Sequence, residues 1–173
     1  TSDYSLVQSL RYSFFNVISV MTTTGLSSTD FVEWGVWTSA VFMLLSLSGG
    51  CTGSTSGSIK IFRWQLIYAY LHKYVLSMVE PNRIIPLRVG IVNPPQNVIT
   101  SVFVYVFSFI ISMLLIGVAI SLCGVDFSTS LAASVACMTN VGVGGVEVIG
   151  PSGNYAFFSE SVKYLLCFAM LLG

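Results

Sequence analysis

Two four-residue segments of the chain combine oxygen-bearing residues with glycine in a way that could bind a cation. They are TTTG at 22–25 and TNVG at 139–142, and each follows a short apolar stretch. A ring of backbone carbonyls can replace the hydration shell of a monovalent cation, and glycine permits the dihedrals that such a ring needs. We therefore expect one ion-selective filter, with these binding residues: Thr23, Thr24, Gly25, Asn140, Val141 and Gly142. The residues that flank them are Thr22, Leu26, Thr139 and Val143.

The two segments end related units of the chain. Alignment of 10–25 with 127–142 pairs Ser13 with Ser130, Met21 with Met138, Thr22 with Thr139 and Gly25 with Gly142. Each unit is predicted to be a short helix followed by a polar T-x-x-G turn. A plain helix-capping turn is the alternative for a single copy, since glycine is common after a helix. Two copies in matching frames favour the filter.

An acidic residue lies five residues after each glycine, namely Asp30 and Glu147. These carboxylates could raise the cation concentration at the outer mouth of a pore. They could equally be ordinary acids of exposed loops, and both interpretations stay open.

The composition indicates a membrane protein. Hydrophobic residues make up 54% of the chain and charged residues 8%, whereas a soluble domain is about a quarter charged. The net charge is zero, which does not favour a nucleic-acid partner. The expected surroundings are therefore the lipid bilayer.

Several stretches are apolar enough to enter that bilayer. Residues 98–123 carry no charge and are long enough to span a core of roughly 30 Å as a helix. Residues 155–173 are a second candidate span. Residues 4–21 and 126–138 are too short or too polar to span, so we expect them to enter the membrane and return.

The region 34–76 is predicted to be one membrane helix broken at 48–58. Unbroken, it would measure roughly 65 Å, about twice the bilayer core. Two separate spans would place Lys60 and Arg63 in the bilayer, where charge is costly. The break could obstruct an ion path and clear it when displaced, with these gating residues: Gly49, Gly50, Thr52, Gly53, Ser54, Thr55, Ser56, Gly57 and Ser58. A cytoplasmic loop between separate helices is the alternative, and a phosphate-binding loop is excluded because GxxxxGK[ST] is absent.

The orientation follows from the basic residues. Five of the seven lysines and arginines lie within 60–96, which predicts a cytoplasmic linker. The T-x-x-G turns then open to the outside. Lys60 and Arg63 could contact a partner or steady the gate, or they could simply anchor the helix at the inner surface.

Three motifs resemble one known family. MTTTGL (21–26), GGCTGSTSGSIKIFR (49–63) and NVGVG (140–144) resemble the Trk/Ktr/HKT superfamily of potassium transporters, and within it the bacterial TrkH-type uptake subunit. The resemblance implies an all-α, potassium-channel-like membrane protein built from helix–pore loop–helix repeats with a broken transmembrane helix. The chain then corresponds to a partial repeat at 1–76, a cytoplasmic linker at 77–96 and a second, truncated repeat at 97–173, all within a longer protein.

The same resemblance implies a function and partners. The family takes up K⁺ through a filter of backbone carbonyls, here Thr23–Gly25 and Asn140–Gly142, and closes it with an intramembrane loop, here Gly49–Ser58. Family members form homodimers in the bacterial cytoplasmic (inner) membrane, cross it several times and bind a cytosolic TrkA-like RCK subunit that carries the nucleotide. No organic cofactor and no enzymatic activity are expected on this chain. Asn140 and Val141 depart from the threonines at 23 and 24, and the basic residue that follows the family's M-L-L-G stretch would lie beyond Gly173.

Two other classes of function remain as alternatives. A membrane scaffold that anchors a soluble complex would tolerate substitution of Gly25 and Gly142. A secondary transporter of an organic solute would need a wider pocket between broken helices.

Overall fold

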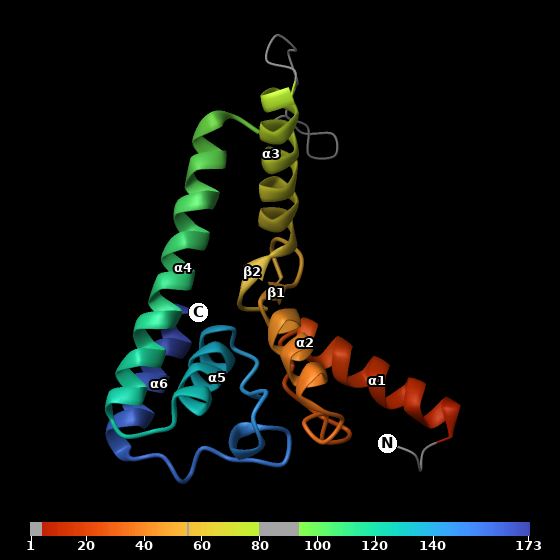
Figure 1. The fold of residues 1–173 in the computed structure, drawn as a ribbon, viewed down its shortest axis with the longest axis vertical. Coiled ribbons are helices and arrows are strands. Elements are labelled where there is room, and N and C mark those ends of the chain that lie inside the picture. The colour runs from red at the N-terminus through yellow and green to blue at the C-terminus, as the bar shows by residue number, and fades with distance from the viewer. Residues whose placement is uncertain (1–4, 55, 80–93) are drawn as a thin grey trace.

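The computed structural model describes residues 5–54, 56–79 and 94–173. Thr55 of the predicted gating loop and most of the predicted linker, 80–93, lie outside the described residues. The elements in chain order are α1 Leu6–Met21, α2 Val36–Ser46, β1 Ser48–Gly49, β2 Ile59–Lys60, α3 Ile61–Val79, α4 Gln96–Leu122, α5 Phe127–Met138, the 3₁₀ helix η1 Glu147–Ile149 and α6 Glu160–Leu172 (Figure 1).

Helix α4 is the long apolar helix that the sequence predicts at 98–123. It has 27 residues, about 40 Å of helix, and among the described residues it alone is long and apolar enough to cross a membrane. The second predicted span, over 155–173, is wrong in its extent. Helix α6 starts only at Glu160 and has 13 residues, because residues 155–158 form turns.

The predicted break in the helix over 34–76 is confirmed. Helix α2 ends at Ser46, and α3 begins at Ile61. Between them β1 and β2 pair in parallel, with Ser48 opposite Ile59. The Ile59 N–H also donates to the Leu47 carbonyl at 3.3 Å. The two ends of the polar segment are thus fastened together, which makes it a compact loop with adjacent ends.

The two predicted short helices are also present. Helix α5 has 12 residues, about 18 Å, and begins where the Asp126 carboxylate accepts the Ser128 N–H at 3.1 Å. Hydrogen bonds from the Ser128 hydroxyl and backbone lower the pKa of Asp126. Helix α5 packs against α4, α6 and α2, whereas α1 contacts α2 and extends away from α4 and α6 (Figure 1).

Helices α4 and α5 approach closely at small residues. The Ser134 hydroxyl donates to the Met113 carbonyl at 2.6 Å. A Cβ added at Gly117 would lie 2.9 Å from Leu131 Cδ2 and 3.6 Å from Ser134 Cβ. Small side chains let helix backbones pack closely in membranes, so this contact fixes the position of α5.

Gly117→Leu is expected to destabilise the full-length protein by about 1–3 kcal/mol, the usual cost of overpacking. The new side chain would force α4 away from Leu131 and Ser134. Thermal unfolding of the detergent-solubilised protein measures the effect. Val118→Leu, at an exposed neighbouring position of α4, is the matched control and should leave the unfolding temperature unchanged.

Candidate ion-binding site

The two T-x-x-G turns fold back onto their helices through matching hydrogen bonds. The N–H of Thr22 donates to the Ile18 carbonyl and that of Thr139 to the Val135 carbonyl, each at 2.9 Å. The hydroxyls of these threonines donate to the same two carbonyls, at 2.7 and 2.8 Å. Thr22 and Thr139 therefore close the helix ends through their side chains.

The next peptide groups point the same way in both turns. The N–H groups of Thr23 and Thr24 donate to the Val20 and Ser19 carbonyls at 3.1 and 2.9 Å. Those of Asn140 and Val141 donate to the Cys137 and Ala136 carbonyls at 3.1 and 3.2 Å. In a trans peptide the carbonyl points opposite to the N–H. The carbonyls that precede these four N–H groups therefore face away from the helix.

The backbone dihedrals repeat as well. In the first turn φ is −86° at Thr22, +54° at Thr23 and +73° at Gly25. In the second it is −83° at Thr139, +56° at Asn140 and +79° at Gly142. Asparagine and glycine tolerate positive φ, but a β-branched threonine rarely adopts it. The positive φ at Thr23 is unfavourable for this residue type, so contacts elsewhere in the fold must hold the backbone in this conformation.

The structure brings the two turns into contact. A Cβ added at Gly25 would overlap the carbonyl oxygen of Val141. The side chain of Val141 is 5% exposed and packs with Val20, Phe31 and Phe42. Its side chain is thus held in the core behind the turns, while its carbonyl is directed at the backbone of the first turn.

Two side chains of α1 hold the segment 26–29, which follows the first turn. Neither was predicted from the sequence. Asn16 is 1% exposed; its amide nitrogen donates to the Thr29 hydroxyl at 3.2 Å, and its oxygen accepts the Ser28 N–H at 3.1 Å. The Ser19 hydroxyl donates to the Leu26 carbonyl at 2.5 Å. A lone amide within the apolar run FFNVIS is the signal that could have identified Asn16.

The second turn is supported differently. Ala133 and Ala136 occupy the positions that match Asn16 and Ser19. Instead, the Tyr155 hydroxyl donates to the Gly142 carbonyl at 2.9 Å. The internal repeat gives no signal for Tyr155, because the matching position in the first unit is Thr38.

Asn16→Ala is expected to destabilise the full-length protein by about 2 kcal/mol, since it removes several partly buried hydrogen bonds. The segment 26–29 would lose its attachment to α1. Thermal unfolding of the detergent-solubilised protein measures the effect. Asn97→Ala, at an exposed position on α4, is the control; an equal effect there would contradict the role of Asn16.

The two acids after the turns differ in structure. The Asp30 carboxylate accepts the Val32 N–H at 2.9 Å and so closes a turn. Glu147 is exposed at the start of η1. Their positions correspond in sequence, but at least one oxygen of Asp30 has a structural role.

The polar loop between α2 and α3 lies against the second turn. A Cβ added at Gly57 would lie 2.8 Å from the Thr139 carbonyl oxygen and 3.0 Å from Asn140 Cβ. A Cβ at Gly49 would overlap the Gly57 carbonyl. The loop thus meets the T-x-x-G turn backbone to backbone, while 51–54 are exposed.

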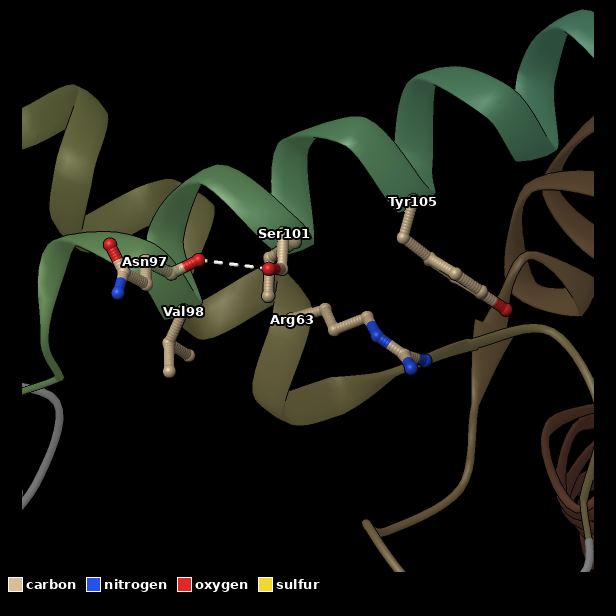
Figure 2. Close-up of a pocket in the computed structure, with 6 residues that line it drawn as sticks. Arg63, Asn97, Val98, Ser101 and Tyr105 are labelled. Atoms are coloured by element: carbon tan, nitrogen blue, oxygen red, sulfur yellow. Dashed lines mark hydrogen bonds between the residues drawn. The ribbon is translucent and has the colours of Figure 1, made fainter.

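Lys60 and Arg63 lie in different environments. The Lys60 ammonium turns back into the loop and donates to the Ser54 carbonyl at 2.8 Å. The Arg63 guanidinium carbon lies 3.9 Å from the centre of the Tyr105 ring. It contributes to an open pocket of about 410 Å³ between α3 and α4, which Figure 2 shows with Asn97 and Ser101.

Comparison with known proteins gives consistent matches. Residues 1–173 match the family described as TrkH, cation transport protein. The chain is 36% identical over 165 residues to the Trk system potassium uptake protein TrkI of Halomonas elongata, covering 95% of this chain and 34% of that protein. It is 29% identical over 170 residues to the Trk system potassium uptake protein TrkG of Escherichia coli K12, covering 98% of this chain and 34% of that protein. The chain spans about a third of the length of the curated relatives it matches.

A solved structure has the same fold. The crystal structure of the potassium transporter TrkH from Vibrio parahaemolyticus matches with a TM-score of 0.90 and 24% identity, covering 99% of this chain and 36% of that one. The predicted all-α fold with its interrupted helix is therefore confirmed.

Proposed function

The chain belongs to the TrkH family of cation transport proteins, and from this premise we propose that the complete protein takes up K⁺ through a filter to which Thr23–Gly25 and Asn140–Gly142 contribute. The observation that carries the proposal is the meeting of the two T-x-x-G turns. Their peptide groups have matching directions, and the Gly25 backbone lies against the Val141 carbonyl. Backbone carbonyls that converge in this way can replace the water around a cation.

The chemistry of the oxygens favours a large monovalent ion. The proposed ligands are carbonyls, and the side chain of Val141 is packed away from them. Neutral oxygens without a carboxylate suit K⁺, whereas divalent cations are usually held by carboxylates. Relatives named as potassium uptake proteins support the same ion. K⁺ is here the cargo, and we propose neither an organic cofactor nor an enzymatic step.

We further propose that the loop 49–58 closes the path. Its support is the contact of Gly57 with the Thr139 carbonyl and Asn140. Displacement of the loop from that position would open a route to the inner side. The acids Asp30 and Glu147 would lie at the opposite, outer mouth, where Glu147 is free to attract cations.

The surroundings of the pore are also proposals. We propose a multi-pass protein of the bacterial cytoplasmic membrane that forms a homodimer and binds a TrkA-like RCK subunit. The exposed apolar side chains of α1, including Leu6, Leu10 and Phe14, would contact further repeats of the same pore. Arg63, partly buried and lining the pocket in Figure 2, could contact a partner or anchor α3.

Cation flux into liposomes that contain the full-length protein tests the proposal. We expect flux of K⁺ that exceeds flux of Na⁺ under equal gradients. Protein-free liposomes are the control. Absence of flux from correctly inserted protein would favour a membrane scaffold, and flux of an organic solute in place of K⁺ would favour a secondary transporter.

A further inference from the structure

The side chain of Lys60 is held inside the polar loop. Its ammonium donates to the Ser54 carbonyl at 2.8 Å and to the Ser56 carbonyl, and it lies 3.5 Å from the Ser54 hydroxyl. Lys60 follows the loop in sequence, so these bonds connect the start of the second half of the broken helix to the middle of the break. Hydrogen bonds from a charged donor are stronger than those between neutral groups.

The oxygens around this ammonium are of the same kind as those of a K⁺ site. Two are backbone carbonyls and one is a hydroxyl, and the ammonium has the charge of the transported ion. The Lys60 ammonium is therefore a cation that is covalently part of the chain. It donates hydrogen bonds to carbonyls that would otherwise need water or an ion as a partner.

The bonds of Lys60 set the shape of the rest of the loop. The Ser56 hydroxyl accepts the Gly50 N–H at 2.9 Å and lies 2.8 Å from the Ser54 hydroxyl. The next residue, Gly57, is the one that meets the Thr139 carbonyl. Fixing the Ser56 carbonyl on the ammonium thus fixes the segment that contacts the second T-x-x-G turn.

The inner end of the loop is anchored independently. Ile59 is 1% exposed and belongs to the same buried cluster as Met138, the last residue of α5. The loop can therefore leave the turn only if Ser54, Ser56 and Gly57 move relative to this fixed end. Such a movement must withdraw the Ser54 and Ser56 carbonyls from the ammonium.

We propose that Lys60 is a positioning residue that latches the loop in its closed conformation through the Ser54 and Ser56 carbonyls. This inference rests on the proposed function, since it assigns the latch to a loop that closes a K⁺ path. Opening then requires the Lys60 ammonium to leave the Ser54 and Ser56 carbonyl oxygens. A regulatory partner would have to supply the free energy for that step.

Flux through the full-length protein without any regulatory partner tests the latch. Lys60→Met keeps the length of the side chain and removes the ammonium. It is expected to raise K⁺ flux by about tenfold, the effect of losing roughly one charge-assisted hydrogen bond, while the ratio of K⁺ to Na⁺ flux stays unchanged. Lys73→Met removes the same charge from a later turn of α3 and should leave the flux at the wild-type level. Unchanged flux in Lys60→Met would overturn the latch, whereas absent flux in the wild type would overturn the proposed function.

A second measurement reports loop opening without relying on flux. Ser58 is 3% exposed, so the thiol introduced by Ser58→Cys, in a protein whose native cysteines are replaced by alanine, should react slowly with a soluble maleimide. Adding Lys60→Met should accelerate that reaction about tenfold. If Lys60→Met does not assemble, Lys60→Arg decides, because a planar guanidinium cannot reproduce the bonds of an ammonium. Faster labelling in Lys60→Arg supports the latch, and an unchanged rate contradicts it.

Discussion

Gly25→Ser is expected to reduce the preference of transport for K⁺ over Na⁺ by at least about tenfold. Two costs coincide at this position. A residue with a side chain at φ +73° loses about 1–2 kcal/mol, and its Cβ would overlap the Val141 carbonyl. The Gly25 Cα and the Val141 carbonyl both belong to the backbone, so neither can move aside as the end of a flexible side chain would. The two turns must separate, which would disturb the spacing of the carbonyl oxygens in the proposed filter.

Two other glycines allow the cost of positive φ to be measured without the cost of steric overlap. Gly142 has φ +79° and Gly124 has φ +89°, and a Cβ at either would meet no atom within 4 Å. Gly142→Ser adds strain alone within the proposed filter, so we expect a smaller loss of selectivity. Gly124→Ser adds similar strain outside it and should not change the K⁺ to Na⁺ flux ratio in liposomes. If Gly25→Ser kept the wild-type ratio, the filter assignment would be wrong.

Gly57→Val is expected to raise K⁺ flux without a partner by about tenfold. The new side chain would collide with the Thr139 carbonyl and Asn140, so the loop could no longer rest against the second turn. An overlap of this kind costs about 1–3 kcal/mol, enough to shift a closed loop toward the open state. Flux measurements in liposomes, with the K⁺ to Na⁺ ratio recorded in parallel, show whether the path opens with its selectivity intact.

Gly53→Ala provides the comparison within the same loop. Gly53 has φ +92°, and a Cβ there would meet nothing within 4 Å. This variant strains the exposed part of the loop but leaves its contact with the turn. We expect wild-type flux from it. Equal flux from both variants, or lower flux from Gly57→Val, would show that the Gly57 contact does not close the path.

Much of the fold could be predicted from the sequence because it depends on length and local pattern. The uncharged run at 98–123 can only be accommodated as a long apolar helix, and α4 is found there. The polar residues at 48–58 interrupt the helix because glycine and serine lack apolar side chains for a membrane helix. The predicted start of the last span, at residue 155, was wrong because residues 155–158 form turns that return the chain from the second T-x-x-G turn. Hydropathy alone does not distinguish such turns from a helix.

The supports of the site could not be predicted in the same way. Asn16 acts through Ser28 and Thr29, and Tyr155 acts through the Gly142 carbonyl. Each partner is more than ten residues away, and its position depends on how the chain returns after the turn. The same holds for the contact between Gly25 and Val141, which lie in different units and meet only because α2 and α5 pack together.

The unlike supports of the two turns bear on how such a unit changes after duplication. An amide from the preceding helix holds one copy, and a phenol from the following segment holds the other, yet the order of φ signs is the same. In these two units the path of the main chain is the same, while the residues that support it differ. Two repeats with few identical residues can therefore still be aligned by the signs of φ over four consecutive residues.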